Sequence, residues 1–363
     1  MKALAAVLLF LAAHPALAQD PPPVYQQPEK FRFTIEALAR YEKTTDIFVS
    51  STETRSEDRF VSWAFPGLEV NLGKFQLGAA GGFYWSDEEN DDPIPAPQRD
   101  NFRSRDARLD RAFAKFETSW LMLEGGRFTM PIAFTEMIWD KELKPQGGAL
   151  RLGVNDRGSL KSFGVTALYA TGSHVFEDDT EVIAASAEVV VATGPESTTQ
   201  LMASYVEFKN LGTVQPFLRR QNLRAGGLLA LDYKVVDAVV RVRRGGTLPL
   251  QLVGNYCWNT AADDLNRGLW LAGVLGSVRS SRARLEYVYA KVDRDATLAE
   301  YNADDFFWNT GWEGHRADLG FRAGKYASLH GVAQWQRFKD APVPQERDHW
   351  VKRYRAELRI ESR

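Results

Sequence analysis

Residues 31–41 read Phe-Arg-Phe-Thr-Ile-Glu-Ala-Leu-Ala-Arg-Tyr, with large apolar side chains at every second position near the start and charged ones between them. Successive side chains of a β-strand point to opposite faces of the sheet, so a period of two predicts a strand with one apolar and one polar face. The same alternation recurs over residues 75–86, 163–169, 183–191, 223–233, 250–259, 283–289, 317–323 and 350–360. Extended along the chain, it predicts about sixteen strands, with fourteen and eighteen as the neighbouring even counts.

The N-terminus has the pattern of a secretory signal. Lys2 precedes an apolar run over residues 3–13, and Ala16-Leu17-Ala18 matches a small-residue cleavage site. The run is too short to cross a bilayer, which argues against the alternative of an N-terminal anchor. We therefore expect a signal peptide over residues 1–18, a Pro-rich extended leader over 19–29, and one β-barrel domain over 30–363. Export in this manner predicts a place in the outer membrane of a Gram-negative cell.

Composition narrows the class of protein. After the signal, the sequence has no run of 18 apolar residues, so transmembrane helices are not expected. Cys257 is the single cysteine and cannot form an internal disulfide, so stability must come from a large sheet. The net charge of −2 is not the basic footprint of a nucleic-acid-binding protein. Aromatic residues near predicted strand ends indicate two interfacial girdles, the alternative being a soluble aromatic core: Trp85, Tyr169, Tyr233, Trp258, Tyr289, Trp335 and Trp350.

The connections between predicted strands alternate in length. Short turns fall at 73–74, 155–158, 194–196, 279–281 and 325–326, and longer polar loops at 44–58, 86–102, 129–148, 210–220 and 293–312. Short turns at one end and long loops at the other are typical of antiparallel up-and-down transmembrane barrels, with the short turns in the periplasm. Residues 235–244 could form a seventeenth strand. Because an even number is needed, we expect residues 235–246 to form a long periplasmic turn or an extension of the strand before them.

The polar face of the strands carries charges of both signs. In a barrel these side chains line an aqueous lumen and set the electric field that a solute meets. The alternative is that they only hydrate and cross-link the wall through cross-strand pairs. The predicted pore-lining residues are Arg32, Glu36, Arg40, Arg111, Lys115, Glu117, Arg224, Arg284, Glu286, Arg316, Asp318, Arg322, Arg353, Arg355, Glu357 and Arg359.

The alternation stops over residues 128–148. This segment is long, aromatic and acidic, and Gly pairs at 125–126 and 147–148 permit sharp bends at its ends. It is too apolar to lie free in water, and loops of this length are usually functional. We expect it to fold into the lumen as a constriction loop, with Glu136, Asp140 and Glu142 facing the basic wall. Packing on the outer rim is the alternative. The residues assigned to this constriction are Arg127, Phe134, Glu136, Trp139, Asp140 and Glu142.

Two blocks of sequence resemble a known family. Gly-Arg-Phe-x-x-Pro at 126–131 is followed by Trp-Asp-Lys-Glu-Leu-Lys-Pro-Gln-Gly at 139–147. A later block runs from Leu285-Glu286-Tyr287 through an acidic loop to Gly314-His315-Arg316. This order resembles the putative porin family of Gram-negative bacteria, distant relatives of phosphate-selective porins. The resemblance implies a porin-like barrel without a catalytic role.

These features together predict a passive diffusion channel for small hydrophilic or ionic solutes, assembled as a homotrimer as general porins often are. Its other partners would be outer-membrane lipid and lipopolysaccharide, with no nucleic acid and no cofactor. The alternative is a structural or binding barrel with an occluded lumen, such as an adhesin, an assembly partner or a sheath. We do not expect an enzyme, because the sequence has no Gly-x-Ser-x-Gly elbow, His-Glu-x-x-His or Walker loop. No predicted strand brings Ser and His together on the lipid face, as a membrane hydrolase would need.

Overall fold

The structure is a computed structural model that describes residues 30–87, 105–171, 180–213, 222–226, 228–303, 309–340, 344–347 and 349–362. The predicted signal peptide and leader lie outside these ranges. The described part of the chain contains no helix long and apolar enough to span a membrane.

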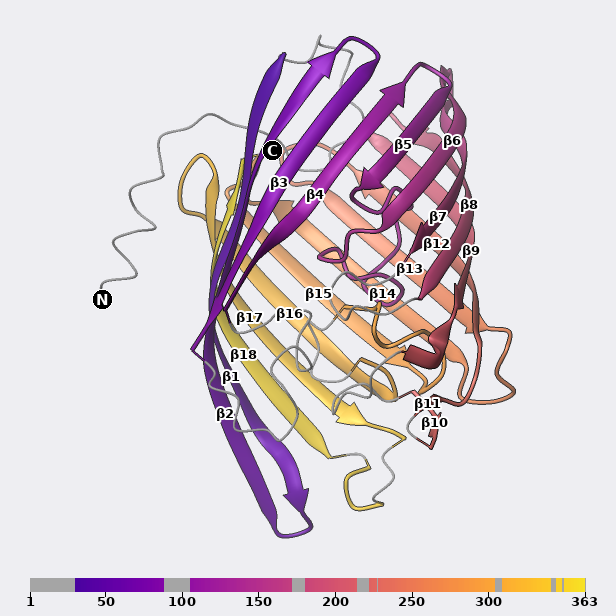
Figure 1. The fold of residues 1–363 in the computed structure, drawn as a ribbon. Helices are drawn as coiled ribbons and strands as arrows, with labels where there is room; N and C mark the ends of the chain where they lie inside the picture. The colour runs from indigo at the N-terminus through magenta and orange to yellow at the C-terminus, as the bar shows by residue number, and fades with distance from the viewer. Residues whose placement is uncertain are drawn as a thin grey trace.

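Sixteen strands of the described chain form one closed antiparallel barrel, in which the first strand pairs with the last (Figure 1). Closure leaves no strand edge exposed, which confirms the predicted architecture and strand count. The wall strands are β1 (Phe31–Ser50), β2 (Glu53–Leu72), β3 (Phe75–Ser86), β4 (Arg105–Glu117), β5 (Leu121–Arg127), β6 (Gln146–Arg157), β7 (Leu160–Thr171), β8 (Glu181–Gly194), β9 (Ser197–Lys209), β12 (Tyr233–Arg244), β13 (Leu250–Asn259), β14 (Arg267–Ser277), β15 (Ala283–Val292), β16 (Trp312–Arg322), β17 (Ala327–Phe338) and β18 (Trp350–Glu361).

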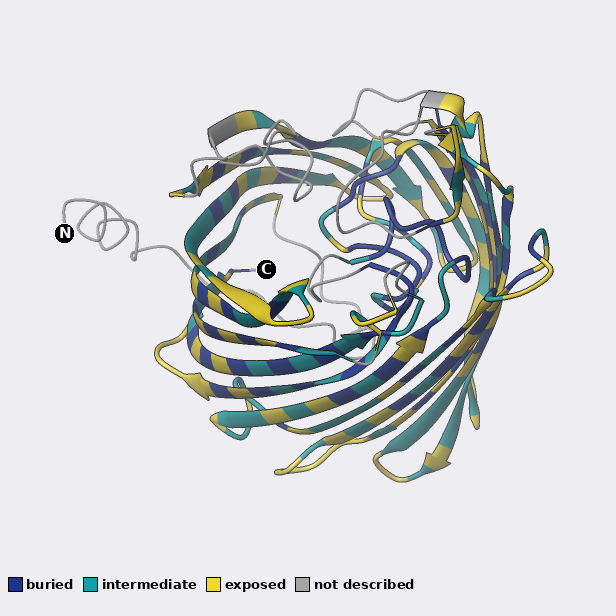
Figure 2. Cartoon of the chain, turned by 90° about the horizontal axis from the view of Figure 1, so that it is seen from below, coloured by how far each residue is buried: buried dark blue, intermediate teal, exposed yellow. Residues whose placement is uncertain are grey.

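The predicted alternation governs which side chains face outward. On β13, Leu252, Tyr256 and Trp258 are exposed on the outer surface, whereas Asn255 and Cys257 between them are buried inside the barrel. Figure 2 shows the same stripes of exposed and buried residues around the whole ring. A large apolar outer surface suits a wall that faces lipid, because each strand then hides its polar positions in the lumen.

The sixteen strands are not all the ones that we expected. Residues 235–246 contain most of β12, a wall strand paired with β9 and β13, and are neither a turn nor an extension. The predicted strand at 223–233 lies instead in the connection from β9 to β12. This connection holds the short helix η2 (Leu211–Thr213) and a two-stranded sheet of β10 (Arg224–Ala225) and β11 (Leu228–Leu229). Tyr233, predicted to face lipid, is buried inside, and its hydroxyl donates to Asp295 Oδ1 at 2.9 Å.

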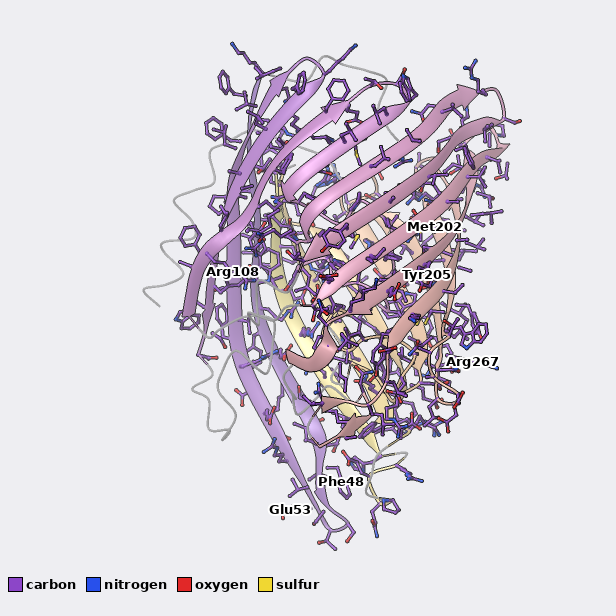
Figure 3. The ribbon with its side chains drawn as sticks, turned by 45° about the vertical axis from the view of Figure 1, so that its right-hand side comes forward. Phe48, Glu53, Arg108, Met202, Tyr205 and Arg267 are labelled. Atoms are coloured by element: carbon purple, nitrogen blue, oxygen red, sulfur yellow. The ribbon has the colours of Figure 1, made fainter. Side chains whose placement is uncertain are left out.

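A second difference concerns residues 44–58, which were expected to form a long polar loop. They are mostly strand, because β1 and β2 run for 20 residues each and join through a turn at Ser51 and Thr52. The hairpin projects past the neighbouring wall, with Phe48 and Glu53 near its tip (Figure 3). Its alternating charges, including Glu53 and Arg55, fit a strand as well as a loop, so the polarity of this segment was misleading.

The interior of the barrel has two unlike halves. Inward apolar side chains, such as Leu168, Val206 and Val239, form one core together with residues of the loops 128–145 and 293–311. Most of the wall residues of this core lie on β7–β14, and we call this side the packed half. The core also extends to β15 and, through Trp312, Phe338 and Val351, to β16–β18. The inward side chains of β1, β2 and β15–β18 include most of the charged residues discussed below, and we call this the charged half. Figure 2 shows the buried loop segments inside the ring. The loop after β15, expected outside the barrel, is thus part of its core.

Close packing between the loop 128–145 and the wall leads to a testable prediction about Gly268 on β14. A Cβ at Gly268 would lie 2.6 Å from both Cys257 Sγ on the wall and Met137 Sδ on the loop. Gly268→Ala should therefore lower the free energy of unfolding by about 1–3 kcal/mol through overpacking, measured by denaturant titration followed by tryptophan fluorescence. Gly273→Ala on the same strand is the control, because its nearest contact would be an ordinary 3.6 Å. Equal effects of the two substitutions would contradict this packing.

Candidate functional site

The segment between β5 and β6 folds into the lumen, as predicted. Phe128, Met137, Ile138 and Leu143 are at most 2% exposed and belong to the apolar core of the packed half. A loop packed on the outer rim would not bury these side chains within the barrel. We call residues 128–145 the constriction loop.

One anchor of the constriction loop is a chain of buried polar side chains. Thr135 Oγ1 donates to Asn255 Oδ1 on β13. The Asn255 amide in turn donates to Asp237 Oδ1 on β12, and Ser204 Oγ on β9 donates to Asp237 Oδ2 at 3.2 Å. A buried carboxylate is costly unless it accepts hydrogen bonds, so this chain both satisfies Asp237 and holds the loop against three wall strands.

A second anchor joins the constriction loop to the other inward loop. Asp140 N donates to Tyr301 O at 2.7 Å, and Ala303 N donates to Glu136 O at 2.9 Å. The rings of Trp139 and Tyr301 lie 5.3 Å apart. The two loops therefore form one hydrogen-bonded unit. Asp140 is buried within it, and its Oδ1 accepts from Glu142 N at 2.8 Å.

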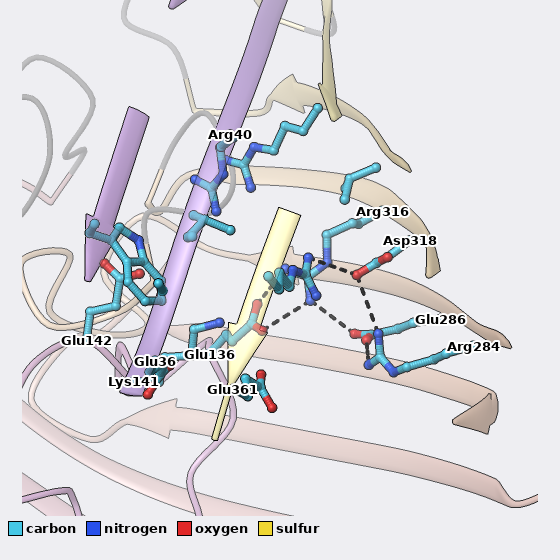
Figure 4. A pocket seen from close by; sticks show the side chains of 16 residues that line it. Glu36, Arg40, Glu136, Lys141, Glu142, Arg284, Glu286, Arg316, Asp318 and Glu361 are labelled. Atoms are coloured by element: carbon cyan, nitrogen blue, oxygen red, sulfur yellow. Dashed lines mark hydrogen bonds and ion pairs between the residues drawn. The ribbon is translucent and has the colours of Figure 1, made fainter. Parts of the chain in front are cut away.

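The third anchor is an ion pair between the constriction loop and the charged half. Arg316 on β16 places Nη1 2.6 Å from Glu136 Oε2, and its Nη2 lies 3.1 Å from Glu286 Oε1 on β15 (Figure 4). The guanidinium carbon also lies 5.6 Å from the centre of the Trp270 ring. A guanidinium can serve two carboxylates at once because its donors form a planar fork. Glu136 thus faces a basic wall residue, as the sequence indicated.

A charged cavity of about 140 Å³ lies between the constriction loop and the charged half (Figure 4). Carboxylates and cations occur in it in equal number. The acids are Glu36, Glu136, Glu142, Glu286, Asp318 and Glu361, and the cations are Arg40, Lys141, Arg284, Arg316, Arg355 and Arg359. Such a lining can keep a permeating ion or a polar solute solvated by fixed charges of either sign.

Strand register arranges the charged half as cross-strand ion pairs. Arg40 Nε lies 2.9 Å from Glu357 Oε1, and Arg359 Nη2 lies 3.0 Å from Asp318 Oδ2. Two of the predicted pore-lining arginines, Arg353 and Arg355, are only 2% and 5% exposed, because they turn toward Glu42 on β1. The charged side chains therefore do both things that the sequence suggested. They cross-link the wall through ion pairs, and some of them also line the cavity.

Glu42 and its partner Arg59 were not among the predicted residues. Arg59 Nε donates to Glu42 Oε1 at 2.8 Å, across the β1–β2 pair. Glu42 follows Arg40 by two positions and so shares its face, a signal that was present in the sequence. The predicted strand ended at Tyr41 and the predicted loop covered residues 44–58, so Glu42 and Arg59 lay just outside both.

Several predicted pore-lining residues lie away from this cavity. Arg32 pairs with Glu69 near the short-turn end, and Lys115 pairs with Glu117 at 3.0 Å. Arg111 is buried beside Asp110 on β4. The remaining two donate elsewhere: Arg322 Nε to Val278 O in a turn at 2.7 Å, and Arg224 Nη2 to Glu300 Oε1 among the inward loops at 2.9 Å.

Three of the residues assigned to the constriction border the loop without lining the cavity. Arg127 ends β5 where that strand pairs with β4 and β6. Phe134 is partly buried and packs against the apolar core. Trp139 is buried, and its indole Nε1 donates to Leu143 O at 3.1 Å. These side chains shape the loop, while Glu136 and Glu142 supply its charge to the cavity.

The charged half also holds a serine, a histidine and an aspartate in hydrogen-bonded order. Ser328 Oγ lies 3.0 Å from His330 Nε2, and His330 Nδ1 lies 2.7 Å from Asp318 Oδ1. A membrane hydrolase would need Ser and His together on the lipid face, whereas these side chains point inward. Asp318 is also bound by Arg284 and Arg359, so its charge is shared with the surrounding ion pairs.

Comparisons with known proteins agree with this fold. A family model described as putative porin matches residues 78–240. The structure is similar to OprB of Pseudomonas putida in a high-pH form, with a TM-score of 0.60 and 13% identity, covering 92% of this chain and 94% of that one. It is also similar to OmpF of Salmonella typhi in complex with daunomycin, with a TM-score of 0.54, 10% identity, and coverage of 93% and 99%.

A third similar structure is an anion-selective porin from Comamonas acidovorans, with a TM-score of 0.50 and 11% identity, covering 91% of this chain and 99% of that one. No curated protein sequence matches the chain. At such low identities the solved structures establish the barrel fold, and the family match covers the wall from β3 into β12 together with the constriction loop.

The Arg316 anchor gives a prediction about the constriction loop. Arg316→Gln would leave Glu136 and Glu286 without the guanidinium that they share, and hydrogen bonds to charged groups contribute about 1.5–3 kcal/mol each. We expect faster trypsin cleavage after Lys141, which is exposed on the loop, in the folded barrel, followed by mass spectrometry. Arg316→Lys keeps the charge but not the fork, so it should give an intermediate rate. Unchanged cleavage in both variants would show that this ion pair does not hold the loop.

Proposed function

We propose that this protein is an outer-membrane porin, a passive diffusion channel for small hydrophilic or ionic solutes. The observation that carries the proposal is the charged cavity between the constriction loop and the charged half of a closed sixteen-stranded barrel. Barrels of this size leave room for an aqueous channel. The family match over residues 78–240 and the porin folds of the similar structures support the same conclusion.

Solutes would cross along the charged half, because the packed half is filled by the two inward loops. In this path no bond is made or broken. Fixed carboxylates and guanidinium groups replace part of the hydration of a passing ion, and their balance sets which sign of charge crosses more easily. We assign Glu136 and Glu142 on the loop, and Arg40, Arg284 and Arg359 on the wall, to the narrowest part. Glu36, Glu286, Arg316, Asp318 and Arg355 line the same cavity. The predicted pore-lining residues away from it would act at the mouths or through the wall.

We further propose that residues 1–18 direct export and are removed, and that the barrel contacts outer-membrane lipid and lipopolysaccharide. No catalytic step and no cofactor belong to this function. The Ser328–His330–Asp318 chain would serve as part of the wall, since Asp318 already forms ion pairs with Arg284 and Arg359.

A homotrimer is the proposed assembly. The outer wall over β4–β8 has a shallow apolar groove where Gly125 and Gly148 lie between Leu123, Leu150 and Tyr169. A second copy of the barrel could bury such a surface more completely than fluid lipid does. Light scattering of the detergent-solubilised protein, corrected for bound detergent, should give three times the mass of one chain. The mass of a single chain would contradict the trimer.

The second candidate is a structural or binding barrel with an occluded lumen. The packed half favours it, because two long loops already fill that side of the interior. The two functions differ in one measurable property, which is whether the charged half forms a continuous path through the bilayer.

Single-channel recording separates the two candidates. We expect ohmic conductance steps when the purified protein enters planar bilayers. In a Cys257→Ser background, Val332→Cys places a thiol in the charged cavity, and a charged methanethiosulfonate reagent should reduce the conductance. Val239→Cys, on the inward face of the packed half, should not respond. A purified protein that gives no conductance would favour the occluded barrel. Block of the Val239→Cys variant but not of the Val332→Cys variant would show that the conducting path does not follow the charged half.

A further inference from the structure

We infer that Glu42 is a built-in counter-ion that sets the ion preference of the channel. This inference rests on the proposed porin function and names a residue that determines its selectivity. Glu42 lies on β1 between Arg59 on β2 and Arg355 on β18, and its side chain is buried in the lumen wall.

The geometry around Glu42 is that of an anion held by arginines. Arg59 Nε donates to Oε1 and Arg355 Nε donates to Oε2, each at 2.8 Å. Arg353 Nε lies 3.7 Å from Oε1. Both carboxylate oxygens are thus engaged by charged donors, which are among the strongest hydrogen bonds in proteins. A small anion dissolved in the lumen would compete for the same guanidinium groups, but Glu42 is covalently fixed among them.

The charge count of this cluster favours anions even with Glu42 ionised. Five guanidinium groups, Arg40, Arg59, Arg353, Arg355 and Arg359, contact the two carboxylates Glu42 and Glu357. The sum is +3, and removal of the Glu42 charge would make it +4. Glu42 therefore cancels positive charge that would otherwise act on ions in the lumen.

The cluster is connected to the proposed path. Arg40 and Arg355 both line the charged cavity, and the Arg40 side chain is partly exposed there. Fixed charges influence mobile ions within about 8 Å at physiological ionic strength, so a change at Glu42 is felt in the cavity beside it. Small inorganic anions and carboxylates are the solutes whose passage Glu42 would restrain.

Substitution of Glu42 by glutamine tests the inference through the reversal potential in a KCl gradient. One unit charge about 8 Å away in a water-like medium corresponds to about a two-fold change in ion preference. Glu42→Gln should therefore raise the chloride-to-potassium permeability ratio at least about two-fold. Glu69→Gln is the matched control, because it removes the same charge beside Arg32, which is 43% exposed toward the short-turn end. Screening by solvent there should make its effect smaller.

Two more variants keep the test decisive if Glu42→Gln fails to fold. Glu42→Asp retains the charge and should keep the wild-type permeability ratio. Arg59→Gln removes one cation from the cluster and should shift the ratio toward potassium, opposite to Glu42→Gln. A conducting Glu42→Gln channel with wild-type selectivity, or an Arg59→Gln shift toward chloride, would overturn the inference. A wild-type protein that conducts no ions would instead refute the proposed porin function.

Discussion

Every other feature of this protein depends on the hydrogen bonding of β1 to β18. Their register, from Glu36 opposite Glu361 to Thr45 opposite Lys352, turns a long meander into a closed wall with one outside and one inside. In an open sheet the two edge strands would expose unpaired backbone groups, which lipid cannot satisfy. Closure removes that cost and fixes the parity of each strand. It also brings Arg353 and Arg355 beside Glu42, so the charged half exists only because the ends of the sheet meet.

The inside of a sixteen-stranded barrel is too wide for wall side chains to fill, and this protein fills half of it with its own loops. The constriction loop and the loop after β15 bury apolar side chains against the inward faces of β7–β14, as in the core of a soluble protein. Buried polar groups such as Asp237 and Asp295 are hydrogen-bonded to neighbouring side chains there. In the other half, the described wall side chains keep their charges and pair with one another. A lumen need not be uniformly polar, and here the loops determine where water and ions remain.

The sequence was sufficient for the architecture because side-chain parity is a local property. Alternation over residues such as 250–259 and 283–289 predicted the strands, and the interruption at 128–148 predicted the inward loop. The prediction from alternation failed where an apolar alternating segment does not belong to the barrel wall. Residues 223–233 pack near the inward loops, whereas Val235–Arg244 carries Asp237 and Arg241 among its valines and still forms β12. Local pattern cannot distinguish an apolar face that meets lipid from one that meets a folded loop.

The candidate site was only partly predictable for the same reason. Glu136 could be placed opposite basic residues because an acidic loop and a basic wall attract each other. The arginine that Glu136 contacts depends on the register of β16 and on the path of the loop, and local sequence predicts neither of these. Asp140 was expected at the same wall, and the structure shows it buried where the two inward loops meet, accepting from Glu142 N within its own loop. Glu42 and Arg59 were missed because they flank residues 44–58, which were predicted to be a loop, and were assigned to no strand.

The distance along the chain between Glu42 and Arg355 has a consequence for biogenesis. These partners are 313 positions apart, so their ion pair forms after β18 has been made and has docked on β1. The apolar contacts between the constriction loop and β12–β14 involve segments closer in sequence and do not need that docking. A nascent barrel could therefore acquire its plug before its charged path. The side of the lumen that discriminates between ions would be the last part to be built, and an unfinished barrel would lack it.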